Sequence, residues 1–148
     1  LNAIKLLYNL HSNKESQDFV KILLDNLLIM NSQLGDPNDL MDFKKNEILN
    51  QIFFTLSGDP SVSLKIESKI FDERLMPSIY ILNLINKSSA DQNYPELLIS
   101  ILASIDGKNW NEIHPQHLQL ILNSLKKYKE GNFFNDIVLE VLMQSNII

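Results

Sequence analysis

The densest group of side chains that could do chemistry is a pair of histidines that flank a proline and follow an acid. His114 and His117 lie three positions apart, and Glu112 precedes them. Two histidines and a carboxylate are a donor set that zinc accepts. Pro115, however, favours the first position of a helix, and this spacing does not place two ligands one turn apart on a face. We therefore interpret the segment as a helix start with surface histidines and predict no metal site.

A second group of oxygen donors consists of three aspartates and an asparagine: Asp36, Asn38, Asp39 and Asp42. A calcium loop places ligands at alternate positions, has a central glycine and ends on a glutamate, and this pattern is absent. Aspartates are also preferred at helix N-termini, where they accept hydrogen bonds from free backbone amides. We interpret Asp36 as an N-cap and Asp39 as a first-turn acid.

No catalytic motif is complete in the sequence. Glu67 and Ser68 resemble the Glu-Ser pair of soluble lytic transglycosylases, but the Gly-Leu-Met-Gln block that follows it in that family is missing. No serine has the flanking glycines of a nucleophile elbow, and the glycines are spread out rather than clustered in a phosphate loop. The absence of cysteine excludes a thiolate nucleophile, a disulfide and a thiolate metal site. We expect no enzyme activity, no catalytic residues and no cofactor.

Aromatic side chains in the last third of the chain are the best candidates for an interaction surface. They include Tyr94, Trp110 and Tyr128. Exposed aromatic residues anchor protein interfaces, whereas buried ones fill gaps between helices. Trp110 falls in a predicted connection rather than on an apolar helix face, so we expect it to be the most exposed of them. Together with His114 and His117, these residues form the predicted interaction surface.

The charge balance argues against nucleic acid as a partner. The chain of 148 residues has 13 basic and 18 acidic side chains and a net charge of −5. Arg74 is its single arginine. A protein that binds a phosphate backbone needs clustered lysine and arginine. We therefore expect the partner to be another protein or an adjacent domain of the same chain.

The length and the apolar segments bound the architecture. No apolar stretch reaches the roughly 20 residues that a membrane-spanning helix requires. The chain begins at Leu1 rather than at methionine, so we expect it to be part of a longer protein. It is long enough to bury one hydrophobic core, and we predict a single domain over residues 1–148. The cellular compartment stays open.

The elements that position the candidate residues are predicted to be helices packed around one buried helix. Residues 15–34 carry apolar side chains around most of a helical circumference, with polar residues on a narrow strip. Such a helix must be enclosed by several neighbours. Ser12 and Glu15 have the spacing of a capping box and would start this helix.

A repeated Gly-Asp-Pro signal predicts sharp turns between helices. It occurs at residues 35–37 and again, 23 positions later, at residues 58–60. Glycine ends a helix in the left-handed conformation, aspartate caps the next helix, and proline opens it. Gly107 and Gly131, which are 24 positions apart, continue the interval. This rhythm predicts helical hairpins, arranged either as a repeat or as a bundle.

Apolar spacing at the helical period predicts the remaining elements. In the first part of the chain, further helices are expected over residues 40–56, 62–70 and 79–85. The last of these is almost continuously apolar and is expected to be deeply buried. Three later helices are expected to begin at Asn93, Pro115 and Asn132.

These expectations define an all-α fold of antiparallel helical hairpins, stacked as a short α-solenoid or packed as an irregular helical bundle. The helix rhythm resembles that of tetratricopeptide and HEAT architectures. The consensus residues of tetratricopeptide repeats are missing, and no family is assigned. The leading hypothesis for function is a non-enzymatic protein-protein interaction or scaffold domain of a larger bacterial protein, because stacked hairpins create an extended groove.

Two other functions fit the same sequence. The chain could be the helical accessory domain of a larger hydrolase, for example one that acts on the cell wall. A catalytic motif in the flanking sequence would reveal that role. Alternatively, the helices could enclose a pocket for a lipid or another apolar ligand, which native mass spectrometry of the purified protein would detect.

Overall fold

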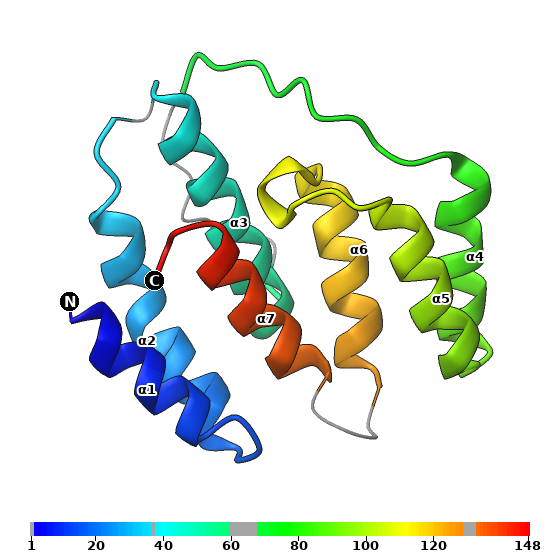
Figure 1. The fold of residues 1–148 in the computed structure, drawn as a ribbon, viewed down its shortest axis with the longest axis horizontal. Coiled ribbons are helices and arrows are strands. Elements are labelled where there is room, and N and C mark those ends of the chain that lie inside the picture. Colours follow the sequence, from blue (N-terminus) through cyan, green and yellow to red (C-terminus); the bar gives the residue numbers. More distant parts are fainter. Residues whose placement is uncertain (1, 37, 60–67, 129–132) are drawn as a thin grey trace.

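The computed structural model describes residues 2–36, 38–59, 68–128 and 133–148. Within these ranges the chain forms seven α-helices and one short 3-10 helix, without any strand, which confirms the predicted all-α class. The elements are α1 (Ala3–Ser12), α2 (Asp18–Ser32), α3 (Leu40–Ser57), α4 (Ile79–Ala90), α5 (Tyr94–Ile105), η1 (Trp110–Glu112), α6 (Pro115–Lys126) and α7 (Phe133–Gln144). They pack against one another in a bundle-like arrangement (Figure 1).

The helix at the centre of this packing is α6 rather than α2. α6 packs against α3, α7 and α4, and it buries residues on more than one face. α2 packs mainly on α3 and α1 and buries one stripe, formed by Phe19, Leu23, Leu27 and Met30. Outside that stripe, Leu28 is 63% exposed. The prediction that residues 15–34 would be enclosed is wrong, because apolar composition permits burial but the number of neighbouring helices decides it.

Local capping sets two helix starts as predicted. The Asn93 side chain accepts a hydrogen bond from the backbone N–H of Glu96 and donates its amide to the Glu96 carboxylate at 2.7 Å. Pro115 occupies the first position of α6, where a missing N–H forfeits no helical hydrogen bond. Gly58 ends α3 in the predicted left-handed conformation, with a φ of 68°. The predicted cap Asn132 lies outside the described residues.

The capping box predicted before α2 does not form. Ser12 is the last residue of α1, and α2 begins only at Asp18. The hydroxyl of Ser16 accepts a hydrogen bond from the backbone N–H of Asp18 at 3.2 Å and stabilises this start instead. The spacing of Ser12 and Glu15 was insufficient because a capping box also requires the serine to lie outside a helix.

The connection after α2 is looser than the predicted sharp turn. Asp39 rather than Asp36 caps α3, and its carboxylate accepts hydrogen bonds from the N–H groups of Met41 and Asp42. The Asp42 carboxylate accepts in turn from the N–H groups of Gly35 and Asp36, at 2.9 and 3.0 Å. The carboxylates of Asp39 and Asp42 therefore accept hydrogen bonds from backbone N–H groups. Across the described ranges, no group of three or more histidine, aspartate or glutamate side chains could hold a metal ion.

The chain between α3 and α4 breaks the predicted rhythm. Residues 68–78 contain no helix and run as a long connection to α4 (Figure 1). Most of the helix predicted over residues 62–70 lies outside the described residues, as do Glu67 and Gly131. In α4, Ile85 is buried but Ile79 at the helix start is largely exposed. Deep burial of this helix was therefore a wrong prediction, because α4 packs on α5 and α6 with one side only.

Arg74 ties the long connection to η1. Its guanidinium donates hydrogen bonds to both carboxylate oxygens of Asp72, at 2.9 and 2.7 Å, and to the carbonyl oxygen of Asn111 at 3.2 Å. Burial by itself would raise the pKa of Asp72. The hydrogen bonds and positive charge of Arg74 outweigh this effect and hold the pKa of Asp72 below its usual value. The ion pair therefore persists throughout the neutral pH range.

We expect the substitution Arg74→Gln to lower the free energy of unfolding by about 1 to 3 kcal/mol, because it removes charge-assisted hydrogen bonds and leaves Asp72 without its cation. Urea unfolding monitored by circular dichroism measures the change. Lys5→Gln, at an exposed position of α1, removes one positive charge without an ion pair and should change stability by less than about 0.5 kcal/mol. Equal effects of the two substitutions would contradict the proposed anchoring of the connection.

Candidate functional site: an apolar groove between α5 and α7

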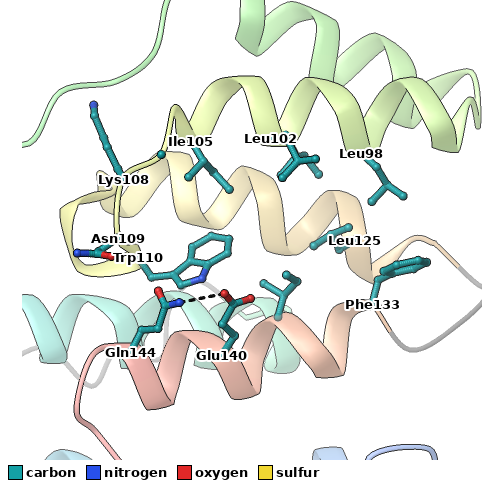
Figure 2. Close-up of a pocket in the computed structure, with 13 residues that line it drawn as sticks. Leu98, Leu102, Ile105, Lys108, Asn109, Trp110, Leu125, Phe133, Glu140 and Gln144 are labelled. Atoms are coloured by element: carbon teal, nitrogen blue, oxygen red, sulfur yellow. Dashed lines mark hydrogen bonds between the residues drawn. The ribbon is translucent and has the colours of Figure 1, made fainter.

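An apolar groove runs between α5 and α7, with α6 and η1 at its base (Figure 2). Its volume is about 520 Å³, which falls in the range of roughly 300 to 1,000 Å³ that is usual for ligand sites. One wall is formed by residues of α5: Leu98, Ile101, Leu102 and Ile105. The facing wall is formed by residues of α7: Phe133, Ile137, Glu140 and Gln144. The base includes Leu125 of α6 and Trp110 of η1.

The walls consist of apolar rows at helical spacing. Leu98, Leu102 and Ile105 follow one another at intervals of four and three positions and therefore share one face of α5. Leu97, on the neighbouring face, is fully buried, whereas Leu102 is 70% exposed. α5 packs mainly on α4, while α7 packs on α6 and η1. Among the described helices, none covers the two facing rows.

Trp110 lies at one end of the groove and is only 6% exposed. The expectation that it would be the exposed aromatic is wrong, because η1 packs against α7 and α3, and Trp110 thereby becomes part of the buried core. The Glu112 carboxylate accepts a hydrogen bond from the backbone N–H of Asn109 at 3.0 Å and holds this short helix in place. The ring faces the groove beside Glu140 and Gln144 (Figure 2).

Charged groups are sparse along the rim. The Gln144 side-chain amide donates a hydrogen bond to the Glu140 carboxylate at 3.0 Å. Lys108, just after α5, lies at the same end of the groove as Trp110 (Figure 2). Both charged side chains belong to exposed residues. The groove therefore offers the Glu140 carboxylate beside an otherwise apolar surface, whereas the Lys108 side chain extends away from it (Figure 2).

Two further residues of the predicted surface lie next to the other end of the groove. The rings of Tyr94 and Tyr128 are edge to face, with centroids 4.1 Å apart, and Tyr128 is 5.3 Å from the ring of Phe133. Phe133 lines the groove at the end opposite Trp110 (Figure 2). Tyr94 and Tyr128 are half-buried. They support a wall residue of the groove rather than form a separate exposed patch.

His117 is buried away from the groove and joins α5 to α6. It is 1% exposed, and its Nε2 lies 2.8 Å from the Ser104 hydroxyl oxygen. Because the Ser104 hydroxyl donates to the carbonyl of Ile101, Nε2 carries the proton and donates to Ser104. Burial, with the nearby positive charges of Lys108 and His114, lowers the pKa of His117 to about 4. The prediction of a surface histidine is wrong here, since helix α6 turns this position into the core.

His114 has a capping role that the sequence analysis did not assign. Its Nδ1 accepts a hydrogen bond from the backbone N–H of Gln116 at 3.1 Å, at the start of α6. The side chain is half-buried and lines a different pocket, between α3 and α6. Of the five residues predicted to form one interaction surface, Trp110 alone lines the groove, and the two histidines lie elsewhere.

The wall residues of α5 were missed although the sequence carried a signal for them. Leu98, Ile99 and Leu102 give this helix apolar side chains outside the face that holds Leu97 and Ile101. A helix that is apolar on more than one face needs more than one neighbour. In α5 this pattern leaves Leu102 70% exposed beside the groove, just as it leaves Leu28 of α2 63% exposed.

No family model, no curated protein and no solved structure matches this chain. In the described part of the chain, every helix is too short or too polar to cross a membrane. The functional argument therefore rests on the geometry of the groove and on the chemistry of its walls.

Proposed function

We propose that this chain is a non-enzymatic interaction domain whose groove binds an amphipathic helix of another protein. The observation that carries the proposal is the pair of apolar rows on α5 and α7, which face each other across α6 without a described helix between them. A helix of about 10 Å diameter laid over α6 would contact both rows. It would pack as an additional helix of the bundle, which is the usual mode of helix-in-groove recognition.

The chemistry of the groove defines the partner helix. Aliphatic walls fit an apolar stripe at positions i, i+3, i+4 and i+7 of the partner. Glu140 on the rim favours a partner helix with a basic residue near its carboxylate. Leu102 and Phe133 are the wall residues with the most apolar surface left to bury, so we assign them the role of anchors.

An apolar small molecule is the second candidate occupant. It is favoured by the volume of about 520 Å³ and by the aromatic rings at both ends of the groove. Native mass spectrometry distinguishes the two occupants, because a small ligand would be retained through purification as a fixed added mass. The alternative role, as an accessory domain of a larger hydrolase, is tested by a search for a catalytic motif in the flanking sequence.

The experiment uses Trp110, the single tryptophan of the chain, as the reporter. Helical peptides are selected against the intact domain by display, and binding of the selected peptides is followed by tryptophan fluorescence. We expect Leu102→Asp to weaken binding by at least about tenfold, because the charge would be buried against the apolar stripe of the peptide.

The matched control is Leu28→Asp on the exposed side of α2, which should bind the peptides like the original chain. Three results would overturn the proposal: no helical peptide is selected, selected peptides tolerate Leu102→Asp, or Leu28→Asp weakens binding equally. Circular dichroism of both variants confirms that each remains helical before binding is compared.

A further inference from the structure

The long connection before α4 contains an extended segment, residues 70–75, that has the form of a single β-strand. Residues 68–78 run without a turn or a bend along the edge of the molecule (Figure 1, green). Between residues 70 and 75 the side chains alternate. Those of Ile70, Asp72 and Arg74 are half-buried, whereas those of Phe71, Glu73 and Leu75 are exposed. Such a period of two is that of a strand, in which successive side chains point to opposite faces.

The inner face of the extended segment is fixed to the bundle. The Arg74 guanidinium binds the Asp72 carboxylate and the carbonyl oxygen of Asn111 in η1, and only 7% of the Arg74 side chain is exposed. The outer face is open to solvent, since Phe71 is 83% and Leu75 76% exposed. The backbone is therefore held extended before any partner arrives, which lowers the entropic cost of binding.

One edge of the extended segment offers a complete set of backbone hydrogen-bonding groups. In a strand, the N–H and C=O groups of one residue point to one edge, and those of the next residue point to the other. Phe71, Glu73 and Leu75 therefore share an edge, and none of their backbone groups is hydrogen-bonded to a described residue. On the opposite edge, the N–H of Arg74 is bonded to the Asp72 side chain. A further strand can thus pair with the edge of Phe71, Glu73 and Leu75.

Open space adjoins the first half of the extended segment. A pocket of about 460 Å³ lies between the segment, α3 and the start of α6, and a pocket of about 520 Å³ lies between the segment and the start of α3. Phe71 and Asp72 line both of them. The described helices therefore leave room for an added chain beside this backbone.

Glu73 determines which side chain the added strand presents. Its exposed carboxylate lies between Phe71 and Leu75 in the outer row, and it forms no ion pair with a described residue, although Lys44 lines the same pocket. Side chains directly opposite each other in an antiparallel pair interact, and opposite charges stabilise the pair whereas like charges destabilise it. The matching strand therefore has a basic residue with an apolar residue two positions before it and another two positions after it.

A second copy of this chain matches the edge less well. In the register that pairs Phe71 with Leu75 of the other copy, the two Glu73 carboxylates would lie directly opposite each other and repel.

We propose that the edge formed by Phe71, Glu73 and Leu75 binds an extended segment of another protein as an added antiparallel strand. The added strand exchanges backbone hydrogen bonds with these three residues, places its basic side chain against Glu73, and covers Phe71 and Leu75 with its apolar side chains. Recognition of this kind is β-strand addition. It does not rest on the helix-binding groove, because residues 70–75 are not among the residues that line the groove.

The probe is the peptide acetyl-Thr-Val-Thr-Lys-Thr-Val-Thr-amide, which has the required pattern and consists mainly of residues that favour strands. In a nitrogen-15 NMR titration of the whole chain, it should give saturable downfield shifts of the backbone amides of Phe71, Glu73 and Leu75, and these amides should exchange more slowly with deuterium oxide. The matched control has glutamate in place of the central lysine and should bind at least about threefold more weakly. Equal binding of the two peptides, shifts confined to other residues, or no saturable shift would overturn the proposal.

Backbone methylation of the peptide tests the strand geometry separately from the side chains. A methyl group on the backbone nitrogen of the central lysine removes the N–H that faces Glu73, so binding should fall by at least about tenfold. The same methyl group on the threonine next to it replaces an N–H that points away, and binding should be retained. If the two methylated peptides bind alike, the contact is not a strand pair and the proposal fails.

The substitution Glu73→Lys should reverse the preference, so that the peptide with the central glutamate binds more tightly than the peptide with lysine. Glu15→Lys makes the same charge change at an exposed position between α1 and α2 and should leave the original preference intact. Circular dichroism verifies that both variants remain helical. An unchanged preference in Glu73→Lys, or a reversed one in Glu15→Lys, would contradict the role of Glu73.

Dilution of the chain without peptide tests the second copy as the occupant. The amide signals of Phe71, Glu73 and Leu75 should not move with protein concentration. Movement of these signals would show that the segment pairs with itself, and the assignment of another protein as partner would be wrong.

Discussion

Replacement of Leu122 by alanine should lower the free energy of unfolding by about 3 to 5 kcal/mol. Leu122 is fully buried in α6, the helix that packs against α3, α4 and α7. The truncation removes apolar contacts and leaves a cavity that closely packed neighbours fill only partly. Urea unfolding followed by circular dichroism measures the loss.

Leu28→Ala is the matched control for this prediction, because it truncates the same residue type within a helix. Leu28 lies on the exposed side of α2, so its truncation should change stability by less than about 0.5 kcal/mol. The comparison decides which helix is the enclosed one. Equal losses at the two positions would favour the sequence-based expectation for residues 15–34 and contradict the packing described here.

Acidification from pH 6.5 to pH 4 should destabilise the fold by about 3 kcal/mol through His117. The pKa of this histidine is about 4 in the folded chain and 6.5 in the unfolded chain. Between these values the unfolded state binds a proton that the folded state does not bind. The free energy of unfolding therefore falls as the pH falls through this window, and the stabilisation is fully present above pH 6.5.

His117→Gln tests the origin of this pH dependence. Glutamine retains an N–H that can donate to the Ser104 hydroxyl but does not titrate. The dependence of unfolding free energy on pH should flatten between pH 4 and 6.5 in this variant, whereas His11→Gln, at an exposed position of α1, should retain it. Asp72 affects the pH dependence mainly below this window. Its pKa in the folded chain lies below 3.8, so the stability that it provides is lost only as the pH falls further. An unchanged slope in His117→Gln would show that another group is responsible.

The bond between His117 and Ser104 also matters for the groove. It joins the first turn of α6 to the end of α5, which carries the wall residues Leu102 and Ile105. The neutral, buried imidazole of His117 thus links α5, which forms one wall of the groove, to α6, which forms part of its base. The position of the groove therefore depends on core polar contacts that no surface pattern indicates.

Helix starts and ends could be predicted where the residues that form the capping hydrogen bonds lie close together in the sequence. The starts of α5 at Asn93 and of α6 at Pro115, and the end of α3 at Gly58, follow from hydrogen bonds and backbone angles within three or four residues. The all-α class follows from apolar periodicity along each segment. Both kinds of inference use only information that neighbouring residues carry.

The sequence by itself determined the all-α class and where several of the helices begin and end. The tertiary structure alone decided that α6 is enclosed and that Trp110 and His117 are buried. The physical reason is that periodicity measures how much apolar surface a helix has. It does not specify which neighbours cover that surface, and the groove between α5 and α7 exists because two such surfaces face each other uncovered.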